Sequence, residues 1–313
     1  MRSAPIWLDA RRRRGRRGKN IAARRWHVEW PTVIVAIAIH GGWLALTWWH
    51  AALPLPLIVA AGAALIAWHG SLQHETIHGH PTGLGWLDAA IGAVPLSLYL
   101  PYVLYRRSHI AHHRSAAITH PDHDPESRYV AGGGRWWQHA LARAQRTLIL
   151  RLLVGPAVAI VSLAGEEAVR LGRDPRGVAR DWLPHLAAVA LIVAWLEWTG
   201  FGIGRYALLV VYPGLSLTLL RSFAEHRADL PQANRAATVE RGGLLGLLYL
   251  NNHLHAAHHE RPDLAWYRLP GYQRRHRRRL TGPALSYRSY GEILRRFAFR
   301  PHDAIVHPQE TAA

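Results

Sequence analysis

Three residue types are missing or nearly missing from this chain of 313 residues. It has no cysteine, one methionine and one lysine, yet its formal net charge is +18. Without cysteine, thiolate zinc sites and iron–sulfur clusters are excluded. With Lys19 as its one lysine, the positive charge is almost entirely arginine. Rich use of arginine, alanine and glycine with so little lysine indicates a bacterium with a GC-rich genome.

Histidine, by contrast, is abundant, with 22 residues. Eight of them form three clusters, His74-Glu-Thr-Ile-His78, His109-Ile-Ala-His112-His113 and His255-Ala-Ala-His258-His259. On a helix, spacings of three and four residues place side chains on one face. Imidazole is the commonest protein metal ligand, and eight converging rings exceed what one ion can bind. The sequence therefore predicts a two-ion site whose candidate ligands are His74, His78, His109, His112, His113, His255, His258 and His259.

His226 is a ninth candidate ligand, because it directly follows an apolar run at the level of the clusters. The remaining histidines break the ligand spacing, and we expect them to bind no metal. Among the carboxylates near the clusters, Glu75 and Glu260 are candidates to orient ligating histidines, although a helix-capping or surface role is the more ordinary expectation.

Apolar runs alternate with arginine-rich segments. Four runs of nearly the length that crosses a bilayer predict two membrane hairpins, at 32–49 with 53–72 and at about 183–199 with 206–220. We expect two further apolar stretches, 86–104 and 148–163, to be interfacial or re-entrant helices. If the second of these crossed alone, the third histidine cluster would lie across the membrane from the first two.

Arginines flank the first hairpin and fill the C-terminal tail, so the positive-inside tendency places both termini and all three clusters in the cytoplasm. The predicted fold is an all-α protein of the bacterial cytoplasmic membrane, with four transmembrane helices in two hairpins and a cytoplasmic histidine-rich helical cap. Residues 1–29 are expected to be a basic arm, 30–275 the membrane domain and 276–313 a basic tail. Since the arginines adjoin apolar spans, the expected partner is an anionic membrane surface and not nucleic acid.

The all-nitrogen ligand set suits iron, copper or zinc. Two adjacent metals held by histidine and exposed to oxygen suit redox chemistry on an unactivated C–H bond better than hydrolysis. Each cluster emerges from an apolar segment, so a lipid-like chain could reach the site from the bilayer.

The order His-x-x-x-His, His-x-x-His-His, His-x-x-His-His between membrane hairpins resembles the membrane fatty acid desaturases over residues 30–275, together with Asp124-Pro-Glu-Ser127 and Trp266-Tyr-Arg-Leu-Pro270. The resemblance implies a di-iron centre that uses molecular oxygen and two electrons to place a double bond in a fatty acyl chain. It also implies that the eight clustered histidines bind iron and that His226 matches an extra histidine of some members. Ser222 departs from the asparagine that members with acyl-CoA substrates often carry there, so that subclass is in doubt.

Other functions remain open on the same scaffold. A hydroxylase or a carotenoid ketolase shares the histidine pattern, although ketolases have aspartate at the position of Glu75, and a small amino-acid-like substrate is a further alternative. A non-catalytic metal-binding or transport protein would place ionisable groups inside the spans, where only His40 is a candidate. No fused electron-transfer domain is visible, so we expect a separate donor such as a ferredoxin, attracted by the basic face.

Overall fold

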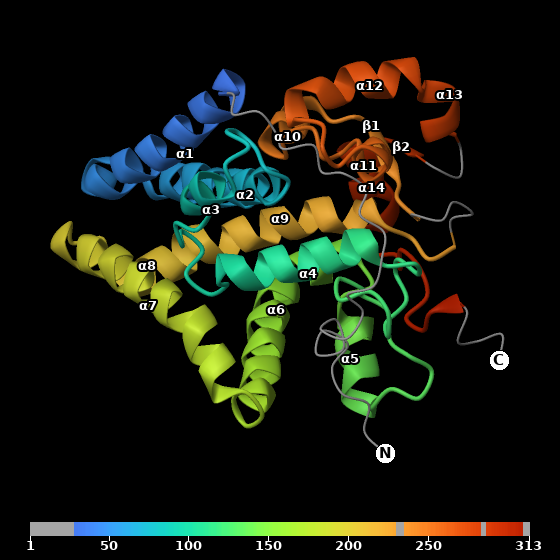
Figure 1. Cartoon of the computed structure of the whole chain (residues 1–313), viewed down its shortest axis with the longest axis horizontal. Helices are drawn as coiled ribbons and strands as arrows, with labels where there is room; N and C mark the ends of the chain where they lie inside the picture. The colour runs from blue at the N-terminus through green and yellow to red at the C-terminus, as the bar shows by residue number, and fades with distance from the viewer. Residues whose placement is uncertain (1–27, 230–234, 283–285, 309–313) are drawn as a thin grey trace.

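The computed structural model describes residues 28–229, 235–282 and 286–308, so the predicted basic arm lies almost wholly outside the described residues. The structure is mostly helical, with two short strands (Figure 1). In chain order the elements are α1 (Trp30–Trp48), η2 (His50–Ala52), α2 (Leu55–Ile77), α3 (Gly85–Gly92), α4 (Tyr102–Arg114), α5 (Trp136–Ala144), α6 (Leu148–Leu171), α7 (Pro175–Trp198), α8 (Ile203–Tyr206), the π-helical turn η3 (Ala207–Val211), α9 (Tyr212–Glu225), β1 (Thr238–Arg241), α10 (Gly243–Leu248), α11 (His255–Glu260), η4 (Trp266–Arg268), α12 (Leu269–Arg275), α13 (Arg277–Leu280), β2 (Ser286–Ser289) and α14 (Tyr290–Phe297).

Among the described residues, five helices are long and apolar enough to cross a membrane: α1, α2, α6, α7 and the continuous helix Ile203–Glu225 formed by α8, η3 and α9. Four of them contain the predicted spans. The fifth, α6, contains the stretch 148–163 that was expected to be interfacial, so the predicted count of four is not confirmed. The outward faces of these helices carry exposed Ile37, Val161, Leu191 and Leu208. Apolar faces of this extent suit a lipid environment, and the chain is an integral membrane protein.

Helix α2 lies at the centre of the bundle and packs against α1, α3 and α9. Helix α2 packs closely against the helix Ile203–Glu225 because glycines lie at the contact. A Cβ atom at Gly62 would lie 2.7 Å from Cγ2 of Val210, and one at Gly214 would lie 2.4 Å from Cβ of Ile66. Small residues allow membrane helices to pack at short distance. In Figure 1, α2, α4 and α9 run in similar directions, whereas α6 is steeply inclined to them.

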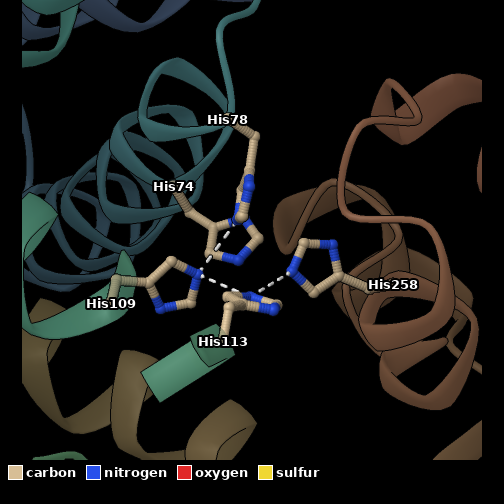
Figure 2. Close-up of side chains that lie close together, drawn as sticks. All are labelled: His74, His78, His109, His113 and His258. Atoms are coloured by element: carbon tan, nitrogen blue, oxygen red, sulfur yellow. Dashed lines mark hydrogen bonds between the residues drawn. The ribbon is translucent and has the colours of Figure 1, made fainter. Parts of the chain in front are cut away.

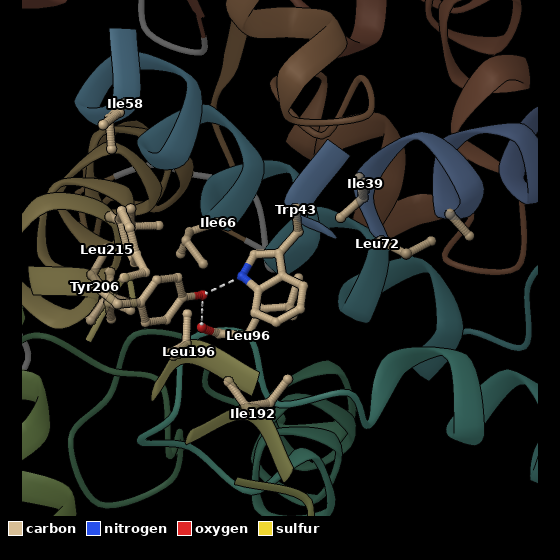
Figure 3. Close-up of a cluster of buried hydrophobic side chains, with 14 of the residues drawn as sticks. Ile39, Trp43, Ile58, Ile66, Leu72, Leu96, Ile192, Leu196, Tyr206 and Leu215 are labelled. Carbon is tan, nitrogen blue, oxygen red and sulfur yellow. Dashed lines mark hydrogen bonds between the residues drawn. The ribbon is translucent and has the colours of Figure 1, made fainter. Parts of the chain in front are cut away.

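The main hydrophobic core fills the space between α1, α2, α7 and the helix Ile203–Glu225 (Figure 3). Its two largest polar-tipped side chains satisfy each other, since Trp43 Nε1 donates to the Tyr206 hydroxyl at 2.8 Å. That hydroxyl in turn donates to the Leu96 carbonyl at 2.6 Å. Buried tryptophan and tyrosine need such partners. The pair therefore ties the segment between α3 and α4 to the bundle.

The C-terminal part of the chain packs on the side where α11 lies. Strand β2 pairs in parallel with β1, with Thr238 opposite Ser286, and α14 buries Ile293 and Phe297. Both elements belong to the segment that the sequence assigned to a basic tail, so much of that segment is part of the folded unit.

Candidate metal centre

The first group of histidines joins three helices (Figure 2). His74 lies in the last turn of α2 and His78 at its C-terminal end, His109 and His113 lie on α4, and His258 lies on α11. One ligand nitrogen from each falls within 4.8 Å of all the others. The spacing of four on α2 and on α4 turns each pair of rings to the same side, as the sequence predicted.

The second group holds His112 of α4, His226 just beyond α9, and His255 and His259 of α11, again with ligand nitrogens within 4.8 Å of one another. Adjacent residues on α4 and on α11 contribute to different groups, so the two helices carry both. All nine histidines singled out in the sequence thus lie in these two groups.

The Nε2 atoms face one another at short distances. His109 Nε2 lies 3.1 Å from that of His78 and 3.1 Å from that of His113, and His226 Nε2 lies 2.8 Å from that of His255. Two nitrogens bound to one ion at about 2.1 Å, at angles between 90° and 110°, lie about 3.0 to 3.4 Å apart. The observed spacing fits ligands gathered around a common cation.

The opposite ring nitrogens are committed elsewhere. His112 Nδ1 donates to Asp124 Oδ1 at 2.8 Å, and His109 Nδ1 donates to Glu126 Oε1 at 3.2 Å. In each neutral ring this leaves Nε2 with a lone pair and no proton. Lone pairs facing each other at 3.1 Å repel unless a cation lies between them. The buried Nε2 of His74 has no hydrogen-bond partner among the described residues. The donor set therefore fits metal ions.

Burial keeps most of these rings neutral. Burial, together with repulsion from neighbouring histidines, lowers the pKa of His113 and of His226 to about 3. Burial is also the largest cause that holds the pKa of His255, His258 and His259 well below the usual range, and repulsion between the rings is the next. Metal binding requires deprotonated imidazole. These five histidines supply it near neutral pH. The pKa of His112 is raised instead, because burial lowers it less than the hydrogen bond to Asp124 and the nearby carboxylates raise it.

The family model for fatty acid desaturases matches residues 48–291, about three quarters of the chain. The chain belongs to the fatty acid desaturase family. No curated protein matches the chain closely enough to add to this. Membership of the family, together with the histidine groups, makes the chain a desaturase-family oxidoreductase.

The carboxylates that orient histidines in this desaturase-family site are largely not those expected. Glu75 is buried, its Oε2 accepts from the Trp266 backbone at 3.0 Å, and its Oε1 lies 3.8 Å from His74 Nδ1. Glu260 instead accepts hydrogen bonds from Tyr272 and Arg279, so that candidate was wrong. Asp124 and Glu126 do the orienting, and their position shortly after the second cluster was the available signal.

His255 of the third cluster and His226 have a different set of orienting groups. Asn252 Oδ1 lies 3.3 Å from His255 Nδ1, and Asn252 Nδ2 donates to Glu225 Oε1 at 2.8 Å. The backbone carbonyl of Arg235 lies 3.3 Å from His226 Nδ1. No sequence pattern indicated these partners, since each becomes a neighbour only in the fold.

Arg128 holds the segment that carries His226. Its guanidinium donates to the carbonyls of Phe223 and His226 at 3.1 and 3.0 Å, and it pairs with Asp303 at 2.6 Å. The C-terminal residues thus contribute to the position of a candidate ligand. The sequence predicted nothing of this arrangement.

The remaining described histidines do not join the two groups. His80 bonds to Glu29 at 2.8 Å, His276 stacks on Tyr272 with ring centroids 4.1 Å apart, and His307 lies beside Thr119. Within the spans, the rings of His40 and His69 lie 5.7 Å apart, away from both groups. That these histidines bind no metal stays a prediction.

A cavity of about 450 Å³ adjoins both groups. His109, His226 and His255 form part of its wall, and Ile66, Leu100, Ala159, Leu215 and Leu219 supply apolar surface. Pockets that bind small molecules typically have a volume in this range and a mostly apolar lining with a few polar groups.

Proposed function

We propose that this protein is an oxygen-dependent di-iron desaturase that introduces a double bond into a fatty acyl chain, linked to a lipid or to a carrier. The observation that carries the proposal is the meeting of nine histidines from four separate segments in two adjacent groups of five and four. Family membership supports the same chemistry.

In this proposal His74, His78, His109, His113 and His258 hold one iron, and His112, His226, His255 and His259 hold the other. Bound there, the irons would supply the oxidation that removes two hydrogens from adjacent acyl carbons, while oxygen takes four electrons in total and leaves as two waters. Two of those electrons come from the substrate and two from a separate donor such as a ferredoxin. Asp124 and Glu126 hold the rings in the neutral, metal-binding tautomer, and the apolar cavity wall holds the chain.

We further propose four membrane crossings in two hairpins, with the histidine cap and both termini in the cytoplasm. His112 and His226 face each other at 3.1 Å, so the chain between them crosses the membrane an even number of times. Three candidate spans, α6, α7 and Ile203–Glu225, lie in that interval. The steep inclination of α6 to α2 and α9 in Figure 1 favours α6 as the one that lies along the surface. We propose residues 30–275 as the catalytic domain, with 1–29 and 276–313 as flanking segments, the second of which packs against the domain through β2 and α14.

Metal analysis of variants tests the proposal. We expect about two irons per chain in the wild type, and loss of iron and turnover in His258→Ala, because its ring lies in the first group and is adjacent to the second. His276→Ala is the matched control, since that ring stacks on Tyr272 outside both groups. His226→Ala should lose most activity if His226 is a ligand.

Lipid analysis of cells with and without the gene identifies the product of the reaction. A new double bond supports the proposal, and a new hydroxyl or keto group would assign the chain to a hydroxylase or ketolase on the same scaffold. Stoichiometric zinc without iron, in protein made with iron available, would overturn the di-iron assignment.

A further inference from the structure

Arg151 is a charged side chain in the first turn of α6 that forms part of the cavity wall. Its guanidinium donates to Ser222 Oγ at 3.2 Å. Its Nε is buried and has no hydrogen-bond partner among the described residues, and none of the described carboxylates forms an ion pair with it. An uncompensated charge in a partly buried position is costly.

The other two arginines of the cavity wall have carboxylate partners. Arg128 pairs with Asp303 at 2.6 Å, and Arg221 pairs with Glu225 at 2.9 Å. Two of the wall's acidic residues, Asp124 and Glu126, are engaged by His112 and His109. Arg151 is therefore the wall's one arginine without an ion-pair partner in the described part of the chain. Asp303 and Glu225 act on it only from beyond ion-pair distance, so its guanidinium is available to an anionic ligand.

We propose that Arg151 binds an anionic group, a carboxylate or a phosphate, on the substrate of this enzyme. This inference rests on the proposed function, because it takes the cavity beside the histidine groups as the substrate site. Arginine binds both oxyanions with two parallel hydrogen bonds. The apolar side chains of the wall, which include Ile66 and Leu219, then contact the hydrocarbon part of the substrate. His109, His226 and His255 border the same space. The substrate class is an amphiphile with its anion inside the protein, and not one whose polar end stays wholly in solvent.

Binding to purified protein in phosphatidylcholine nanodiscs tests this without turnover. The probes are octanoate, octyl phosphate and 1-octanol, measured by calorimetry against empty nanodiscs. The wild type should bind at least one of the two anions more tightly than 1-octanol, and Arg151→Gln should weaken that anion about ten- to a hundredfold while leaving 1-octanol unchanged. Arg151→Lys should retain part of the affinity. Tighter binding of octanoate assigns a carboxylate, and tighter binding of octyl phosphate assigns a phosphate.

Arg146→Gln is the matched control. Arg146 also has a buried Nε without a hydrogen-bond partner, but it does not line the cavity, so its replacement should leave anion binding unchanged. Equal affinity of the wild type for anions and 1-octanol, or equal loss in both variants, would overturn the proposal. Iron content is measured in the same samples. A protein that binds anions through Arg151 but holds no iron would contradict the proposed reaction and leave the anion site standing.

Discussion

Asp124 connects a loop to a candidate metal ligand. One oxygen accepts from His112 Nδ1 and from the Glu126 backbone at 2.9 Å, and the other accepts from the Thr119 backbone at 2.8 Å. Burial alone would raise the pKa of this carboxyl, but the bond to His112 and the backbone donors lower it below its usual range. Asp124 is therefore ionised near neutral pH, and it fixes both the tautomer and the orientation of His112.

Replacement of Asp124 by Asn should weaken metal binding about ten- to a hundredfold, as loss of such orienting partners typically does. The amide can still accept from His112, but it lacks the charge that favours the Nδ1 proton. Iron retention against a chelator series measures the effect. Asp122→Asn is the control, because Asp122 is exposed two residues away, and equal iron retention in the two variants would remove Asp124 from this role.

At the scale of residues, the sequence singled out the nine histidines that lie in the two groups, because ligand spacing on a helix is a local property; that they bind metal stays a prediction. Their grouping could not be predicted, since it depends on how α4 and α11 face each other. The orienting residues were harder still. Arg128 acts through a contact between segments far apart in the chain, and Glu260 directly follows the third cluster but accepts hydrogen bonds from Tyr272 and Arg279 instead.

At the scale of elements, the length of α6 and the contact between His112 and His226 lead to different positions for this helix. Its 24 residues are enough to cross a membrane, whereas the even number of crossings between His112 and His226 requires one candidate span to stay on one side. Length and composition are local properties, so they cannot distinguish a surface helix from a spanning one. The contact between distant histidines can.

Single cysteines test the position of α6 directly, because the chain has no native cysteine. Gly172, in the turn between α6 and α7, is exposed and has space for a side chain. In intact cells, Gly172→Cys should resist a membrane-impermeant maleimide and react after permeabilisation.

Two further positions calibrate that measurement. Ala51→Cys, in the exposed turn between α1 and α2, should react in intact cells, and Asp122→Cys should react only after permeabilisation. Labelling of Gly172→Cys from outside would place the α6–α7 turn across the membrane and refute the proposed two hairpins.

At the scale of the whole molecule, the two histidine groups connect α2, α4, the end of α9 and α11. Ions bound there would act as cross-links between the membrane bundle and the cap, because a preformed site is absent from the unfolded chain. An ion present at a thousand times its dissociation constant adds about 4 kcal/mol to stability.

Removal of the metal by chelation should therefore lower the melting temperature, by roughly 10 °C for a stabilisation of that size. Static light scattering or intrinsic fluorescence during heating can record it. His258→Ala should melt near the chelated wild type and respond little to chelator. An unchanged melting temperature after complete iron removal would show that the cap is held without the ions.

The order of the ligands along the chain has a consequence for biogenesis. Four of the five histidines of the first group lie before residue 114, but three of the four in the second lie at or beyond residue 226. A ribosome that has synthesised α4 has already supplied most of one proposed iron site and a single candidate ligand of the other. Neither proposed site has all its candidate ligands until α11 has been synthesised, because the adjacent residues His258 and His259 of α11 belong to one group each. A chain cut short before α11 would leave both proposed sites incomplete, so the metal centre can form only after α11 has been synthesised.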